Sequence, residues 1–268
     1  MSAGRLVRGE PFPVHVILIR SRIPWGISAA SLLLIVCMEV FRFGLAWMTF
    51  ESASRHAMAG ETNAAIKGLK DAIALDPGKS LYHHGLGSVY ARVFETTGEK
   101  SAFQDAHAEF KEAIALNPLD GRLLGLLGQL YVSAARAPYT SGISNGQRRA
   151  WLAAAVPVYE QAIQLAPFSA MYRYEQARLY WQIGKRGEAD RRAKGAEILA
   201  PNYLPARALL AQLWVDEGQV EGAKHQLREI QERQMRYKQW QKNSLDHAFL
   251  NVDVTAIRAA VGEKESTG

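Results

Sequence analysis

The sequence predicts an all-α protein with a transmembrane helix near the N-terminus, followed by an α-solenoid of about five helix–turn–helix repeats. Two observations lead to this prediction. Residues 23–50 are almost uncharged, and four later segments place small and apolar residues at constant distances before a proline. Self-similarity at a period of roughly 20–50 residues is typical of repeat proteins. The chain of 268 residues has a mean hydropathy of −0.14, which averages over these two unlike parts.

The apolar segment at residues 23–50 is long enough to cross a bilayer. Only Glu39 and Arg42 interrupt it with charge, and its 28 residues would form a helix of about 42 Å, against a hydrocarbon core of ~30 Å. Glu39 and Arg42 are three residues apart, so they share a helix face and can pair, which lowers the cost of placing them near a membrane interface. A buried core helix and a cleaved signal peptide are the alternatives. The apolar region is long and lacks a small-x-small cleavage site, which disfavours the signal peptide.

The charges that flank this segment predict its orientation. Residues 1–22 contain Arg5, Arg8, Arg20 and Arg22 against Glu10 alone. Basic residues stay on the cytoplasmic side of a membrane helix. We therefore expect a cytoplasmic arm at residues 1–22 and a single-pass helix at 23–50. The protein would lie in the inner (cytoplasmic) membrane of a bacterium, with the repeats on the periplasmic side.

The repeat is visible when the later segments are aligned on Pro77, Pro118, Pro167 and Pro201. Alanine recurs twelve residues before each proline, and again five residues before it. Nine residues after the proline stands Gln176 in the third segment and leucine in the other three, followed by a small residue at ten and an aromatic residue at thirteen. The alanines of the first column are Ala65, Ala106, Ala155 and Ala189, and the aromatic residues are Tyr90, Tyr131, Tyr180 and Trp214. Small residues allow two helices to approach closely, and the aromatic side chain fills the space beside them.

The prolines are not evenly spaced. Pro167 and Pro201 are 34 residues apart, whereas the two earlier intervals are 41 and 49 residues. The surplus falls at residues 94–102 and 137–152. Both segments are read as enlarged loops or as longer helix ends.

This spacing resembles the tetratricopeptide repeat (TPR) family, whose unit is a 34-residue helix–turn–helix. The resemblance covers residues 44–235 and implies a right-handed α-solenoid. Its first helix, at about residues 44–58, would overlap the membrane helix. Gly60, Gly184 and Gly218 stand at turn positions that favour a positive φ. Residues 236–268 would form a polar capping helix and a tail.

A second, weaker resemblance concerns residues 81–118. This run is similar to repeats that follow the last membrane helix of O-antigen ligase or polymerase-like bacterial proteins. Those proteins carry about a dozen membrane helices, so the resemblance implies a cell-envelope setting, in polysaccharide assembly or secretion, without ligase chemistry.

No catalytic or metal-binding motif is present. The seven histidines form no metal-ligand spacing, and the single cysteine, Cys37, lies inside the apolar segment, where a reactive thiolate is disfavoured. There is no nucleotide-binding or nucleophile-elbow sequence. We expect a protein that is not an enzyme and that needs no cofactor. An enzyme whose site has no recognisable motif is the rival interpretation.

The resemblance also implies a binding surface, because the first helices of TPR units line a concave groove. The positions exposed there combine cations with aromatic and amide side chains, which suits a partner peptide of acidic or aromatic character. A solvated face that binds nothing tightly is the alternative. The residues singled out are His84, Arg92, Arg122, Gln129, Tyr174, Arg178, Trp181 and Gln212. The family's carboxylate clamp fits only at Arg178, so that specific function is not expected.

The predicted function is a membrane-anchored protein–protein interaction scaffold. Its partners would be the lipid bilayer and another protein. The alternative is an accessory subunit of a membrane complex, docked through Glu39 and Arg42. The basic stretch at residues 224–242 suits anionic lipid, nucleic acid or a solvated end helix. Nucleic acid is excluded if the repeats are periplasmic.

Overall fold

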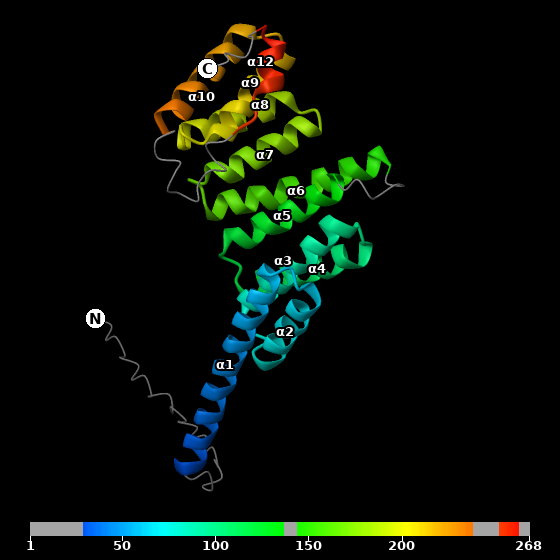
Figure 1. The fold of residues 1–268 in the computed structure, drawn as a ribbon, viewed down its shortest axis with the longest axis vertical. Coiled ribbons are helices and arrows are strands. Elements are labelled where there is room, and N and C mark those ends of the chain that lie inside the picture. Colours follow the sequence, from blue (N-terminus) through cyan, green and yellow to red (C-terminus); the bar gives the residue numbers. More distant parts are fainter. Residues whose placement is uncertain (1–28, 137–143, 238–251, 263–268) are drawn as a thin grey trace, which may run out of the picture. The chain divides into compact units, whose positions relative to one another are not determined.

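The computed structural model describes residues 29–136, 144–237 and 252–262, and every regular element within these ranges is an α-helix (Figure 1). The chain divides into two compact units, Met1–Arg42 and Phe43–Gly268. The helices are α1 (Ala29–Met58), α2 (Thr62–Leu75), α3 (Ser80–Thr97), α4 (Lys100–Leu116), α5 (Gly121–Arg136), α6 (Asn145–Leu165), α7 (Ala170–Gln182), α8 (Arg186–Leu199), α9 (Leu204–Asp216), α10 (Val220–Tyr237) and α12 (Thr255–Ala260).

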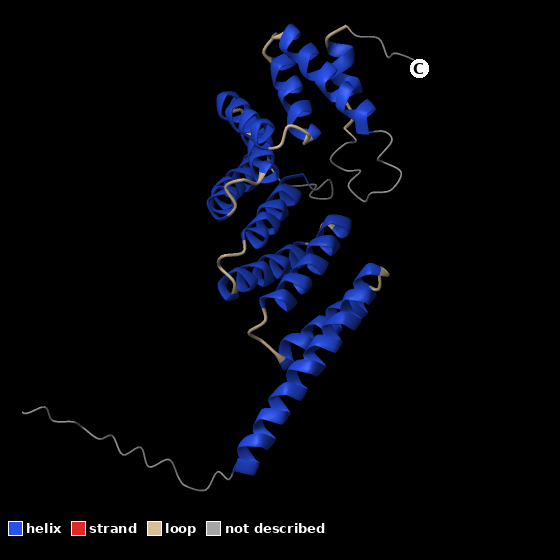
Figure 2. Ribbon diagram, turned by 90° about the vertical axis from the view of Figure 1, so that its left-hand side faces the viewer, coloured by secondary structure: helices blue, strands red, loops and turns tan. Residues whose placement is uncertain are grey.

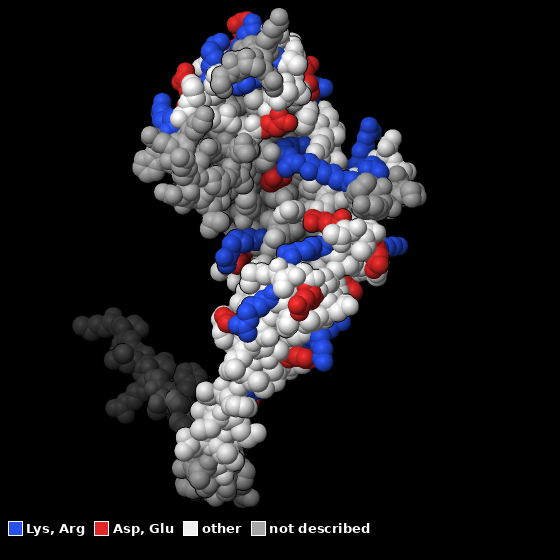
Figure 3. All heavy atoms as spheres, viewed as in Figure 1, with Lys and Arg blue, Asp and Glu red and all other residues white. Residues whose placement is uncertain are grey.

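Helix α1 runs without interruption through Ala29–Met58 and so belongs to both units. Among the described residues it is the one helix long and apolar enough to span a membrane; its most apolar stretch has a mean hydropathy of 1.8 and is 6% buried. Its surface is almost free of charged side chains on the face shown in Figure 3. Glu39 and Arg42 form the ion pair expected from their spacing, at 2.6 Å. The predicted arm at 1–22 and the first residues of the predicted span lie outside the described residues.

In the second unit, helices that follow one another in sequence pack against one another in space (Figure 2). The C-terminal half of α1 packs on α2 through Ala53, Ala65 and Leu69. The predicted turn glycines Gly60, Gly184 and Gly218 have φ values of 79°, 84° and 75°. These angles lie in the left-handed region that glycine adopts without steric strain. The five helical hairpins predicted from the repeat are therefore present.

The alanine columns of the sequence are the contact points between helices. Ala65, Ala106, Ala155, Ala189 and Ala223 are all 0% exposed. The small residue ten positions after each proline lies on the helix that faces these alanines, and it too allows the two helices to approach closely. A Cβ at Gly87 would lie 2.8 Å from the Phe110 ring, and one at Gly128 would lie 2.6 Å from the Tyr159 ring. These distances are shorter than van der Waals contact, so only glycine allows the two helices this separation.

The surplus residues of the long repeats extend helices. Only Gly98 and Glu99 separate α3 from α4, so residues 94–102 contain no enlarged loop. The added turns of α4 and α6 meet in an aromatic cluster. The ring centroids of Phe103 and Trp151 are 4.8 Å apart, and those of Tyr131 and Trp151 are 5.8 Å apart. Part of the second surplus, residues 137–143, lies outside the described residues.

The last hairpin is covered by α12. Val254, Ile257 and Val261 pack against a buried cluster of α9 and α10 that contains Ala211 and Leu227. The capping helix predicted at 236–250 falls mainly in residues 238–251, outside the described residues. Helix α12 thus buries apolar surface of the final repeat, as a solenoid end requires.

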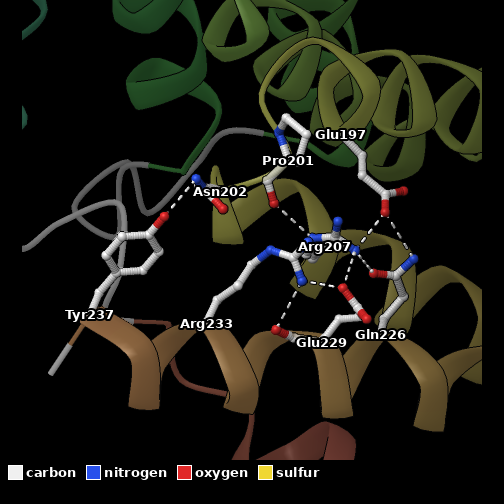
Figure 4. A network of polar contacts seen from close by, with 8 residues as sticks. All are labelled: Glu197, Pro201, Asn202, Arg207, Gln226, Glu229, Arg233 and Tyr237. Carbon is white, nitrogen blue, oxygen red and sulfur yellow. Dashed lines mark hydrogen bonds and ion pairs between the residues drawn. The ribbon is translucent and has the colours of Figure 1, made fainter.

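Helices α8, α9 and α10 are also joined by a buried polar network around Arg207 (Figure 4). Arg207 is 5% exposed. Its Nε donates to the Pro201 carbonyl at 2.9 Å, and its Nη1 donates to Gln226 Oε1 at 2.8 Å and pairs with Glu197 Oε1 at 2.6 Å. Burial lowers the pKa of Arg207, and the Glu197 carboxylate opposes that effect. A buried guanidinium with this many acceptors holds the three helices in one arrangement.

Candidate functional site

The second unit contains a groove of about 760 Å³, lined mainly by α3, α5 and α7. This volume is within the range of small-molecule pockets. Its apolar lining includes Leu81, Leu123, Leu126, Val132 and Met171. A groove with an apolar lining and polar groups around it can hold an extended segment of another molecule.

Four of the eight residues predicted for the groove line it: His84, Arg122, Gln129 and Arg178. They come from three successive first helices, α3, α5 and α7, and their role in binding a partner stays a prediction. The ring of Tyr174 lies behind Arg178, with the guanidinium carbon 5.5 Å from the ring centroid. Tyr174 also packs edge-on against Tyr203, at 5.4 Å. We assign Tyr174 a positioning contact to Arg178.

The other three predicted residues lie away from the groove. Arg92 donates from Nη1 to the Ala57 carbonyl at 3.0 Å, which ties α3 to the end of α1. Trp181 and Gln212 both donate to the Asp216 carboxylate, at 3.1 Å and 2.8 Å. Arg92 and Trp181 thus connect different helices of the solenoid, whereas the Gln212 contact lies within α9; all three side chains are occupied by contacts within the chain.

Several groove residues were not predicted from the sequence: Lys79, Asp120, Arg136, Tyr159, Tyr172 and Glu175. Lys79 and Asp120 lie in the loops before first helices, outside the helical register that was counted. Arg136 is seven residues after Gln129 and so lies on the same helix face. Extending the helix-face pattern two turns beyond Gln129 would have identified Arg136.

The groove has an excess of positive charge. Lys79, Arg122, Arg136 and Arg178 line it, against the carboxylates of Asp120 and Glu175. Arg122 forms a two-pronged contact with Asp120 through Nε at 2.9 Å and Nη2 at 2.7 Å. Arg178 Nη1 is 3.0 Å from each carboxylate oxygen of Glu175. Both carboxylates are therefore already paired, and the surplus of two cations remains.

The pKa shifts in the groove agree with this charge balance. The hydrogen bond from Arg122 lowers the pKa of Asp120. Burial, and then the charge of Arg122, lowers the pKa of His84, which favours the neutral form of this ring. Burial, and then the charge of Arg178, lowers the pKa of Arg136. A negative group brought between Arg136 and Arg178 would relieve the repulsion between them.

The described residues hold no group of three or more His, Cys, Asp or Glu side chains placed to bind a metal ion. Cys37 is exposed on α1. Two histidines of the repeats make hydrogen bonds within the chain: His83 Nδ1 is 2.7 Å from Glu109, and His107 Nε2 is 3.0 Å from the Tyr131 hydroxyl. The described chemistry of the groove is that of charge and shape recognition.

No protein-family profile matches the chain, and comparison with curated proteins finds no match. Solved structures do match. The MamA RS-1 ArsTM double mutant has a TM-score of 0.58 at 16% identity, covering 71% of this chain and 95% of that one. MamA residues 41 to the end from Desulfovibrio magneticus RS-1 has a TM-score of 0.54 at 16% identity, covering 74% and 97%.

A third match is a thermophilic TPR protein of Thermus thermophilus, with a TM-score of 0.51 at 18% identity, covering 72% of this chain and 97% of that one. The comparisons do not support the resemblance to O-antigen ligase repeats. The helix pairs, the buried alanine columns and these matches agree on one architecture. The chain has the tetratricopeptide-repeat fold.

Proposed function

We propose that this protein is a membrane-anchored scaffold that binds an extended, acidic segment of a partner protein in the groove of its repeats. The observation that carries the proposal is the groove itself, where four basic side chains face two carboxylates over an apolar lining. The mechanism is equilibrium binding, without a covalent step.

The chemistry of the lining specifies the segment. Arg136 and Arg178 favour a carboxylate, because charge-assisted hydrogen bonds to guanidinium groups are strong and directional. Leu81, Leu123 and Met171 favour apolar side chains between the acidic ones. A segment that alternates acidic and apolar residues matches both features.

The anchor is α1. Its exposed apolar surface suits lipid contact, and its length exceeds what a bilayer core requires. The arginines of residues 1–22 favour a cytoplasmic N-terminus. We propose that the protein lies in a bacterial inner membrane with its repeats on the periplasmic side.

Peptide binding to the full-length protein in detergent micelles tests the groove. The probe is a fluorescein-labelled synthetic peptide in which Glu alternates with Leu, and anisotropy gives its Kd. Replacing Lys79 and Arg136 together by Gln removes the surplus charge and should weaken binding about tenfold or more, which corresponds to 1.4 kcal/mol or more. Higher salt should weaken binding by the unchanged protein.

The matched control replaces Lys67 and Lys111 by Gln, two exposed basic residues outside the groove. This variant should bind the peptide as the unchanged protein does. A peptide with Gln in place of Glu should bind much more weakly. Equal binding of the Gln peptide, or an equal loss in the control variant, would contradict the proposal.

A second candidate function follows from the ion pair in α1. Glu39 and Arg42 are both about half exposed, and they are the two charged residues in the part of α1 up to residue 50. Charged side chains within a membrane segment commonly mark a polar contact with another helix. Under this alternative the protein is an accessory subunit of a membrane complex. Replacing both residues by Leu should abolish co-purification of partner subunits from membranes. Unchanged recovery would reject this role.

A further inference from the structure

The proline-containing loops of the first three hairpins lie along one edge of the second unit. The Ser80 hydroxyl at the start of α3 donates to the Ala113 carbonyl near the end of α4, at 2.9 Å. Gly121 at the start of α5 faces the Ala162 carbonyl and the Leu165 side chain near the end of α6. These contacts make the loops at 76–79, 117–120 and 166–169 neighbours, which we call the proline edge.

The apolar part of α1 within the second unit reaches the same edge. Ala46 is buried against Ala72 near the end of α2 and Tyr82 near the start of α3. The ring centroids of Phe50 and Tyr82 are 5.1 Å apart. The loop at 76–79 joins α2 and α3, so α1 passes it at about Ala46. The exposed apolar residues of α1 around that point are Phe43, Leu45, Trp47 and Met48.

The proline edge exposes large apolar side chains. Leu119 is 79% exposed and Phe168 is 85% exposed, and each directly follows the proline of its loop. Leu116 and Leu165 add partly exposed apolar surface beside them. Large apolar side chains that are exposed to water do not stabilise the folded chain. Their clustering on adjacent loops therefore indicates a surface that contacts another molecule when the protein functions.

The opposite edge has a different composition. Its turns carry Glu61, Glu99, Lys185 and Gln219 beside their glycines. Met58 and Val220 are the large apolar side chains exposed there within the described ranges. Both edges carry charged residues, since the loops of the proline edge contain Asp76, Lys79 and Asp120. The proline edge differs in exposing Leu119 and Phe168 directly after two of its prolines.

We propose that the proline edge docks on the lipid bilayer, with Leu119 and Phe168 inserted at the boundary between headgroups and acyl chains. This inference rests on the proposed membrane anchoring through α1. Beside the loop at 76–79 the edge adjoins the exposed apolar residues of α1, and this proximity to the proposed anchor selects lipid as the occupant over a second copy of the chain. Protruding side chains on separate loops also suit a fluid surface, whereas a protein interface requires a shaped, packed patch.

Docking has a consequence for the groove. Gly78, Lys79, Leu116 and Asn117 line the groove and belong to the proline edge or adjoin it. A partner segment bound there lies next to the bilayer. The partner class that fits is a membrane protein with an acidic segment close to its own membrane helix.

Fluorescence of the full-length protein in liposomes tests the docking. Cys37→Ser provides a background without native thiols, and Phe168→Cys or Leu119→Cys carries an environment-sensitive dye. The liposomes contain phosphatidylcholine, phosphatidylglycerol and a lipid with a nitroxide on its acyl chain. Dyes at both positions should be quenched about twofold or more, as expected for insertion of roughly 5–10 Å. A dye at Glu99→Cys, on the opposite edge, should not be quenched.

A dye at Ile35→Cys distinguishes the proposed anchoring through α1 from the proposed docking of the proline edge. Quenching at position 35 without quenching at 168 and 119 would overturn docking while anchoring stands. No quenching at position 35 would overturn anchoring itself, and docking with it. A dye at 168 that is shielded from aqueous iodide but not quenched by the lipid nitroxide would mean that protein covers the edge, which also rejects the lipid proposal.

Discussion

Gln176 occupies a position in α7 where the equivalent residues of other repeats are Leu86, Leu127 and Leu210. It is 0% exposed, like the core leucines around it. Its Oε1 and Nε2 atoms have no hydrogen-bond partner among the described residues. Burying an amide in this way costs on the order of 1–3 kcal/mol, because water contacts are lost and not replaced. The repeat pattern is therefore violated here at an energetic cost.

Restoring the pattern should stabilise the protein. Gln176→Leu is expected to raise the free energy of unfolding by about 1–3 kcal/mol. Urea denaturation of the full-length protein in detergent, followed by circular dichroism, should show a higher midpoint with an unchanged slope. Gln161→Leu, at an exposed position of α6, is the control and should change stability by no more than about 0.5 kcal/mol. A less stable Gln176→Leu protein would contradict this interpretation.

In the groove, the pairing of single arginines with carboxylates contributes to recognition. Arg122 and Arg178 are each held by a neighbouring carboxylate, so their positions are set before any partner arrives. Preorganised charges lose less conformational entropy on binding than free ones. Lys79 and Arg136 supply the net charge, which is why the peptide-binding test removes those two and leaves the paired arginines in place.

At the scale of whole helices, α10 is attached by polar contacts as well as by apolar packing. Leu227 and Ile230 are buried against α9 and α12, and Gln226 joins the Arg207 network. On the same helix, Arg233 forms a close ion pair with Glu229. The hydrogen bond from Arg233 is the main cause that lowers the pKa of Glu229, and the charge of Arg207 adds to it.

This pKa shift predicts an acid-dependent loss of stability. The pKa of Glu229 is lower in the folded protein than its ordinary value of 4.5, so folding favours the ionised form. The contribution to stability is therefore complete above pH 4.5 and is lost as the pH falls through the folded-state pKa. Thermal unfolding of the full-length protein between pH 7 and pH 3 should show a smaller fall in Tm for Glu229→Gln than for the unchanged protein. An equal fall in Tm for the two proteins would show that ionised Glu229 makes no contribution to the stability of the fold.

At the scale of the whole molecule, the proposed anchoring makes a topological prediction. In a Cys37→Ser background, Glu99→Cys should react with a membrane-impermeant maleimide in spheroplasts, because its turn is exposed and the repeats are proposed to be periplasmic. Ser2→Cys should react only after lysis, because arginine-rich flanks remain cytoplasmic. The reverse labelling pattern would contradict the proposed orientation. Loss of position 2 from the membrane-bound protein would indicate a cleaved signal peptide.

Much of this fold was predictable from local spacing. The alanine columns and the turn glycines are repeated at constant distances because each hairpin must bury the same face against its neighbours. For that reason the helix pairs of the second unit, the buried residues and the turns at Gly60, Gly184 and Gly218 could all be deduced before the structure was known. The same spacing selected His84, Arg122, Gln129 and Arg178, which line the groove and whose role in binding stays a prediction.

The sequence by itself determined the repeat and the apolar helix, since these depend on residues a few positions apart. Only the tertiary structure decided the extent of the groove. It brought in Lys79 and Arg136 and directed Arg92, Trp181 and Gln212 into contacts within the chain. The groove depends on how successive hairpins are rotated, and that rotation is set by packing across many helices, including the longer α3, α4 and α6. Residues far apart in the sequence determine it together, so no local pattern contains it.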